Sequence, residues 1–168
     1  MMVIKEIAVY TNILNCRIKK YFADILNKNN INLTPEQFLV MDWLWKEQPI
    51  SQQRIAEVIQ KDKNSVTKFI DSLEKKNLVF RTVDEVDRRI NKIALTREGA
   101  DMELATTEVA IDFMNDVVKG IDENDLKTFV KVSLQMKDNL EKPFVLMKLK
   151  RKKRLKRKKR MTSMRLQI

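Results

Sequence analysis

The fold of this chain is decided by residues 51–80, SQQRIAEVIQKDKNSVTKFIDSLEKKNLVF. Ser51 and Asp62 are residue types that cap helices, and an apolar pattern of helical period follows each of them. After Asp62 the apolar residues recur at i, i+3, i+4 and i+7, namely Val66, Phe69, Ile70 and Leu73. The stretch predicts two short helices joined by a tight turn, the second of them buried on one side and polar on the other.

The period of the pattern changes from helical to alternating after Leu78. Residues 79–83 and 90–95 alternate between two faces, and the charged stretch DEVDRR, residues 84–89, separates them. Alternation on both sides of a short polar stretch predicts a β-hairpin of two strands with a charged tip. Two short helices followed by such a hairpin form a winged helix-turn-helix.

Helices are predicted on both sides of this region. Residues 3–28 carry apolar residues at seven-residue intervals and predict one long helix. Thr34-Pro35-Glu36-Gln37 has the composition of a capping box and predicts a helix that ends before Pro49. Two further helices are predicted, from Thr96 to Gly120 and from Asp122 to Pro143. The expected fold is therefore mostly α, with about six helices and a two-stranded β-hairpin wing.

Composition excludes several classes of protein. The chain has 168 residues, which suits one domain, and it contains no histidine and one cysteine, Cys16. Cys/His zinc sites and Ser-His-Asp triads are therefore excluded, and the sequence has no Gly-rich phosphate loop. No apolar run reaches the roughly 18 residues of a membrane span, and Lys5 and Glu6 do not suit a signal peptide. We expect a cytoplasmic protein that is not an enzyme and has no metal, cofactor or membrane partner.

The net charge of +11 is concentrated at one end of the chain. Residues 142–168 hold 13 of the 34 Lys and Arg residues and no acidic residue, so the rest of the chain is close to neutral. Three interpretations of this tail stay open: a flexible arm that adds non-specific DNA affinity, a low-complexity extension without a role, or a helix on a membrane surface. Because of this distribution, an argument for DNA binding has to rest on local patterns.

The polar side of the second short helix has the chemistry of a DNA-recognition helix. An asparagine such as Asn64 can make paired hydrogen bonds to adenine in the major groove. Ser65 and Thr67 can bind phosphates or bases, and Lys63 and Lys68 can neutralise phosphates or reach guanine. The hairpin tip carries Arg88 and Arg89, and arginine is attracted to narrow minor grooves.

The same residues resemble the MarR family of transcriptional regulators. The resemblance rests on SQQRIAE (51–57), DKNSVTK (62–68), LEKKNLV (73–79), DEVDRR (84–89) and LTREG (95–99). It covers about residues 3–142 and is sharpest from 51 to 99. Gln60 and Asn77 stand where glycine is common in the family, which indicates a slightly different turn at Gln60.

The resemblance implies a homodimer that binds a near-palindromic double-stranded DNA operator. The dimerisation helices would be residues 3–28 and 97–142, the DNA-binding lobe would be residues 34–99, and residues 143–168 would be a basic tail. Asp87 would hold Arg89 in a conformation that reaches into the minor groove. The predicted DNA-binding residues are Ser51, Lys63, Asn64, Ser65, Thr67, Lys68, Arg88 and Arg89. Neither the operator nor the choice between repressor and activator follows from the sequence.

Two features of the resemblance concern small molecules. Family members often bind small aromatic ligands, and Tyr10, Trp43 and Phe113 are candidates for such a pocket, although aromatic residues here also suit a plain core. One branch of the family senses peroxides through a cysteine in the first helix. In that branch the cysteine lies nearer Tyr10, which favours Cys16 as an unreactive residue in or near the dimer core.

A different class of function stays open beside DNA recognition. The winged helix could serve protein–protein or RNA contacts, with the basic tail as a non-specific nucleic-acid binder. The two hypotheses differ in one structural feature. A protein that recognises DNA bases needs Asn64, Thr67 and Lys68 exposed, with their side of the helix directed away from the dimerisation helices.

Overall fold

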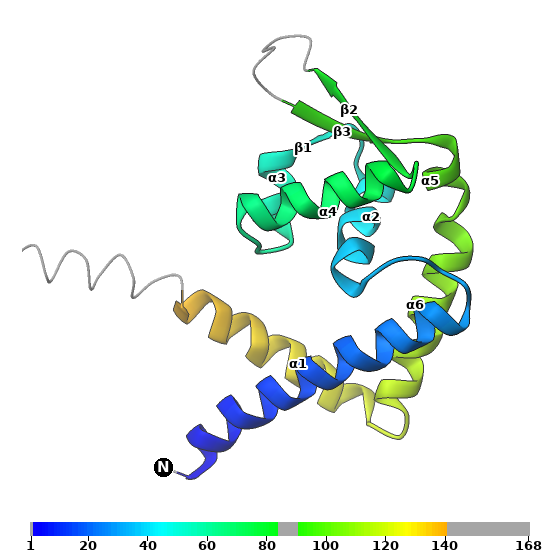
Figure 1. The fold of residues 1–168 in the computed structure, drawn as a ribbon. Coiled ribbons are helices and arrows are strands. Elements are labelled where there is room, and N and C mark those ends of the chain that lie inside the picture. The colour runs from blue at the N-terminus through cyan, green and yellow to red at the C-terminus, as the bar shows by residue number, and fades with distance from the viewer. Residues whose placement is uncertain (1, 84–90, 141–168) are drawn as a thin grey trace, which may run out of the picture. The chain divides into compact units, whose positions relative to one another are not determined.

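A computed structural model describes residues 2–83 and 91–140 of the chain. These described residues divide into two compact units, with the boundary between Val117 and Val118. The elements in chain order are α1 (Met2–Lys28), α2 (Pro35–Lys46), β1 (Ile50–Ser51), α3 (Gln52–Val58), α4 (Lys63–Lys75), β2 (Val79–Val83), β3 (Asn91–Leu95), α5 (Arg97–Asp101) and α6 (Glu103–Val118) (Figure 1). Residues 123–140, in the second unit, are also helical. The predicted class, mostly helical with a winged helix-turn-helix, is confirmed.

The structure confirms the predicted helix starts. They could be predicted because each capping side chain bonds to a backbone group only three positions away. Thr34 Oγ1 accepts a hydrogen bond from the Gln37 backbone N–H at 3.2 Å, and the Thr34 N–H donates to Gln37 Oε1 at 3.1 Å. Ser51 Oγ accepts from the Arg54 N–H at 3.1 Å, and Asp62 Oδ1 accepts from the Ser65 N–H at 3.0 Å. Each cap satisfies a backbone donor that the first turn of a helix leaves without an intrahelical partner.

The sheet has one strand more than the sequence predicts. Its order is β1-β3-β2 with antiparallel pairing, and β1 pairs Ile50 with Ile93 and Ser51 with Lys92. The hairpin of β2 and β3 is as predicted, with Arg81 opposite Ile93. A strand of two residues shows no alternation, so β1 could not be recognised from its sequence.

The predicted helix from Thr96 to Gly120 is two helices, since α5 ends at Asp101 and α6 begins at Glu103. The start of α5 lies against Leu78, in the segment between α4 and β2. Gly99 is buried there, and a Cβ atom at this position would lie 2.0 Å from the Leu78 carbonyl oxygen. The Trp45 indole N–H donates to the Gly99 carbonyl at 2.9 Å. Glycine is therefore required by close packing of backbone against backbone.

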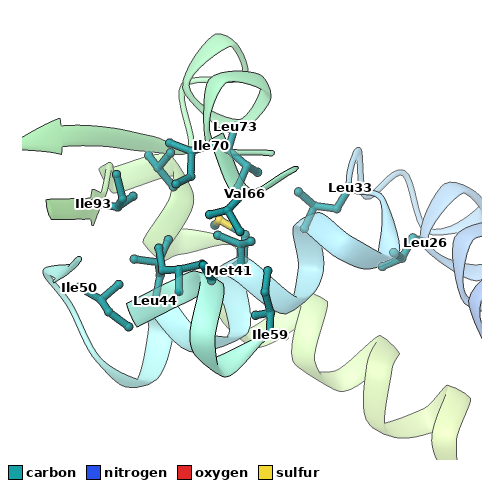
Figure 2. Packing of buried hydrophobic residues seen from close by; sticks show 14 of the residues in the cluster. Leu26, Leu33, Met41, Leu44, Ile50, Ile59, Val66, Ile70, Leu73 and Ile93 are labelled. Carbon is teal, nitrogen blue, oxygen red and sulfur yellow. The ribbon is translucent and has the colours of Figure 1, made fainter. Parts of the chain in front are cut away.

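The core of the first unit joins α2, α3, α4 and the sheet to the C-terminal end of α1. Figure 2 shows this packing, with α4 contributing Val66, Ile70 and Leu73. α1 contributes Phe22 and Leu26, whereas large apolar residues along the rest of α1 are exposed, among them Val3, Ile4, Ile7, Tyr10, Ile13 and Leu14. α1 therefore carries more apolar surface than its own unit covers.

Two further observations concern the described residues. No helix among them is long and apolar enough to cross a membrane. In the same part of the chain, no group of three or more Cys, Asp or Glu side chains is arranged to hold a metal ion.

Candidate nucleic-acid interface

The helix-turn-helix is built from α3, a tight turn and α4. The Lys61 N–H closes the end of α3 by donating to the Ala56 carbonyl at 3.0 Å. Gln60 has φ 54° and Asn77, after α4, has φ 58°, so both adopt the left-handed conformation that glycine adopts without strain. The two positions where this sequence lacks the family's glycine therefore keep the glycine conformation.

α4 has the two faces that the sequence predicts. Val66, Ile70 and Leu73 have no exposed surface, and they pack against the other helices and the sheet. Lys63, Asn64 and Lys68 are exposed on the other side. The first turns of α4 therefore present one amide and two ammonium groups to solvent.

The hydroxyl groups of Ser65 and Thr67, which the sequence predicts to contact DNA, form hydrogen bonds within the protein. The Ser65 hydroxyl donates to Asp62 Oδ2 at 2.7 Å. Thr67 Oγ1 donates to the Lys63 carbonyl at 2.9 Å and accepts from Gln52 Nε2 at 2.5 Å. A hydroxyl has one proton to donate, so Thr67 keeps only its methyl group and one lone pair for another partner. Ser51 is likewise occupied as the cap of α3.

Gln52 is a residue of the site that sequence reasoning missed. It begins α3, is half-buried, and lies beside α4 through its hydrogen bond to Thr67. Its partner is 15 positions away in the chain, and nothing in the local pattern links the two residues.

The hairpin is tied to α4 by an ion-pair cluster that the sequence did not reveal. The Arg81 guanidinium on β2 donates to Asp71 Oδ1 at 2.6 Å and also pairs with the Glu74 carboxylate. The Glu74 carboxylate also accepts a hydrogen bond at Oε1 from the Arg81 backbone N–H, at 3.1 Å. These contacts fix β2 relative to α4. The predicted wing residues Asp87, Arg88 and Arg89 lie outside the described residues.

The electrostatic environment shifts the pKa of the two residues that flank α4, Asp62 and Lys76. Hydrogen bonds from the Ser65 hydroxyl and backbone N–H lower the pKa of Asp62 below its ordinary value. Burial lowers the pKa of the Lys76 ammonium, which follows the last turn of α4. Lys76 therefore differs from its exposed neighbour Lys75, a difference that the local sequence pattern does not reveal.

A cavity of about 240 Å³ lies in the first unit between α1, α2 and α6. Its lining is mostly apolar and includes Ile18, Phe22, Phe38, Ala110, Phe113 and Met114. Lys19 and Glu36 also line it and form an ion pair at 3.0 Å. Burial raises the pKa of Glu36, but the hydrogen bond from Lys19, a backbone hydrogen bond and the positive charges of Lys19 and Lys61 together outweigh this effect, and the pKa lies below its ordinary value.

Of the three predicted pocket residues, only Phe113 lines this cavity. Tyr10 is 65% exposed on the N-terminal half of α1. Trp43 packs against the core, and the Lys46 ammonium lies 5.8 Å from the centre of its ring. Cys16 is exposed on α1, with its thiol 4.0 Å from Asn12 Oδ1. Tyr10 and Trp43 therefore do not line this cavity, because the helical phase decides which side chains face it.

Together, α3, α4 and the β2–β3 hairpin define a winged helix-turn-helix protein. Comparisons with known proteins agree with this class. Residues 33–90 match the model of the MarR family. The regulator YsmB of Bacillus subtilis is 24% identical over 125 residues, which are 74% of this chain and 84% of YsmB. The repressor MdtR of Bacillus subtilis is 34% identical over 83 residues, 49% of this chain but only 52% of MdtR.

A solved complex of Staphylococcus aureus MepR with DNA has the same fold. It superimposes with a TM-score of 0.73 at 22% identity and covers 79% of this chain and 96% of MepR. Within this fold, residues 33–90 are similar to the MarR family of winged helix-turn-helix transcriptional regulators.

Proposed function

We propose that this protein is a cytoplasmic transcriptional regulator that binds a specific double-stranded DNA sequence as a homodimer. The observation that carries the proposal is the division of α4 into two faces. Val66, Ile70 and Leu73 anchor the helix in the core, while Lys63, Asn64 and Lys68 are exposed. This is the arrangement that a recognition helix requires, because the major groove is wide enough to admit one helix.

The exposed groups divide into one that can distinguish bases and two that position the helix. Asn64 can donate to and accept from the edge of adenine, whereas Lys63 and Lys68 act mainly on phosphates. Thr67, whose hydroxyl is occupied by Gln52 and Lys63, contributes its methyl group as a contact for thymine. Arg88 and Arg89, supported by Asp87, stay our proposed minor-groove contacts.

Homodimerisation is supported by the apolar residues that a single chain leaves exposed. In the first unit they include Ile4, Ile7 and Leu14 on α1. In the second unit, the helix of residues 123–140 exposes Phe129, Val130, Leu134 and Leu140. A second copy of the chain is the partner that we propose for both surfaces. Two-fold symmetry would then place two recognition helices about 34 Å apart, one turn of DNA.

Modulation by a small ligand is supported by the cavity between α1, α2 and α6. Its aromatic residues Phe22, Phe38 and Phe113 suit an apolar or aromatic molecule, and its ion pair of Lys19 and Glu36 offers one polar partner. We propose this cavity, in place of a pocket around Tyr10 and Trp43, as the ligand site.

Selection of bound sites from random duplex DNA tests the proposal. The full chain and a variant truncated after Met147 should enrich the same near-palindrome. Truncation removes basic groups that meet phosphates without regard to sequence, so it should lower affinity for all duplexes and flatten the salt dependence. Failure of the full chain to enrich any duplex would contradict the proposal. Enrichment that disappears on truncation would favour the interaction module with a nucleic-acid-binding tail.

A further inference from the structure

A buried amide joins the recognition helix to α2. Gln37, in the first turn of α2, is 4% exposed. Its Nε2 donates to Ser72 Oγ at 2.8 Å, and its Oε1 accepts from Lys76 Nζ at 2.8 Å as well as from the Thr34 N–H. One side chain therefore caps its own helix and holds the last turn of α4.

Lys76 is bound on its other side by the loop between α1 and α2. Its Nζ donates to the Asn32 carbonyl at 2.8 Å in addition to Gln37. Two of its three N–H donors are therefore used inside the protein, and the ammonium is half-buried. Lys75, the preceding residue, is exposed.

These contacts lie at the opposite end of α4 from the groups that face DNA in our proposed function. Asn64 and Lys76 are 12 positions apart, about 18 Å along a helix. If the C-terminal end were held less firmly, a tilt of only about 5° would move Asn64 by roughly 1.5 Å over that length. A shift of this size is enough to break a hydrogen bond to a base edge.

We propose that Gln37 and Lys76 are positioning residues for base recognition. They hold the C-terminal end of α4 on α2 and thereby determine which bases Asn64 prefers, and Lys76 makes no phosphate contact. The inference rests on the proposed function, since it concerns how the same recognition helix is held.

The first test compares Gln37→Leu with Gln37→Glu in the full chain. Leucine removes every hydrogen bond of the amide at similar volume. Glutamate can still accept from Lys76, from the Ser72 hydroxyl and from the Thr34 N–H. Competition binding measures the affinity of each variant for duplexes that differ at one base pair. For Gln37→Leu, the ratios between these affinities should differ from those of the parent by about fivefold or more. Gln37→Glu should restore the parent's ranking of duplexes.

A purely structural role for Gln37 gives a different result. Loss of folded protein alone would lower the measured affinity for all duplexes by one factor and leave their ranking unchanged. Binding is therefore measured below the unfolding temperature of each variant. An unchanged ranking in Gln37→Leu overturns the proposal.

The second test compares Lys76→Met with Lys75→Met, which removes the same charge at the neighbouring position. A phosphate contact by Lys76 would be revealed by a log–log salt slope that flattens by about 0.9 per contact, with the ranking unchanged. We expect Lys76→Met to keep the parent's slope and change the ranking, and Lys75→Met to keep the ranking. A flattened slope with an intact ranking overturns the proposal. If the parent selects no duplex at all, the proposed function has failed, and the inference fails with it.

Discussion

Asn64 is the exposed amide at the start of α4, and its substitution should affect specificity more than overall affinity. Replacing it by alanine should cost about 1–3 kcal/mol on the preferred site and relax the preference at one position in each half-site. Lys63→Met, at the adjacent exposed position, is the matched control and should weaken binding to all duplexes similarly. Site selection with the two variants measures the difference. A uniform loss for Asn64→Ala would show that Asn64 only positions the helix.

Asp62 makes the first turn of α4 sensitive to acid. Its carboxylate accepts hydrogen bonds from the Ser65 hydroxyl and backbone N–H, and its pKa is lowered in the folded protein. A lowered pKa means that the stabilisation is present above the ordinary pKa of aspartate and is lost as the pH falls through the folded value. Urea unfolding from neutral to acid pH should therefore show the parent losing stability relative to Asp62→Asn, which keeps a neutral cap.

Ser65→Ala provides the control for this acid effect. It removes the donor with the largest influence on the Asp62 pKa and leaves the carboxylate in place. The acid-dependent loss of stability should then be smaller than in the parent and be complete at a higher pH, because the folded pKa lies closer to the ordinary value. A difference between the parent and Asp62→Asn that does not vary with pH would contradict the assignment.

Among the elements, the attachment of β2 to α4 depends on Arg81. Its partners are Asp71 and Glu74, and all three side chains are partly exposed. Arg81→Met should lower the free energy of unfolding by about 1–2 kcal/mol, because charge-assisted hydrogen bonds are lost but solvent screens part of their strength. Arg54→Met, which removes an exposed ion pair to Glu57 at 3.9 Å, should change stability by less than about 0.5 kcal/mol.

The same variant should affect DNA binding through the hairpin. Arg81→Met leaves the exposed face of α4 intact, so we expect weaker discrimination among sequences flanking each half-site and unchanged preference at the central positions. Competition with duplexes that vary only in their flanks measures this effect. An equal loss of sequence discrimination at central and flanking positions would mean that Arg81 supports α4 itself.

Helix boundaries were predictable from sequence to the extent that their causes are local. The caps at Thr34, Ser51 and Asp62 each involve a partner three positions away, so the pattern contains both partners. The pairing of β1 with β3 joins Ile50 to Ile93, and no local pattern specifies it. The break between α5 and α6 likewise had no signal in the periodicity of residues 97–118.

The candidate site also contains features with local causes, which could be predicted, and features that depend on tertiary packing, which could not. Helical period separates Val66, Ile70 and Leu73 from Lys63, Asn64 and Lys68, and the structure confirms these two faces of α4. The hydrogen bonds of Thr67 to Gln52 and of Gln37 to Ser72 depend on how α3 and α2 pack against α4. The sequence could therefore show which side of α4 is exposed, but not which of its polar groups are already occupied.

At the scale of the whole molecule, we expect a homodimer. Light scattering at micromolar concentration should give twice the chain mass. Leu14→Lys places a charge among the exposed apolar residues of α1 and should shift the population toward monomer, since burial of one leucine side chain is worth about 1.5–3 kcal/mol. Asn27→Lys, at an exposed position near the end of α1, adds the same charge and should leave the dimer intact. A monomeric parent would contradict the prediction.

The first turn of α2 both lines the cavity and contacts α4, the proposed recognition helix. Pro35, Glu36 and Phe38 line the cavity, while Gln37 between them binds Ser72 on α4. A small aromatic compound that occupies the cavity and weakens operator binding tenfold must itself bind the operator complex tenfold more weakly, a coupling free energy of about 1.4 kcal/mol. Calorimetric titration of that compound into free and operator-bound protein measures this factor from both directions. Gln37→Leu leaves the cavity lining in place, and the compound should then bind the free and the operator-bound protein with nearly equal affinity. An unchanged tenfold ratio would mean that the coupling does not depend on Gln37.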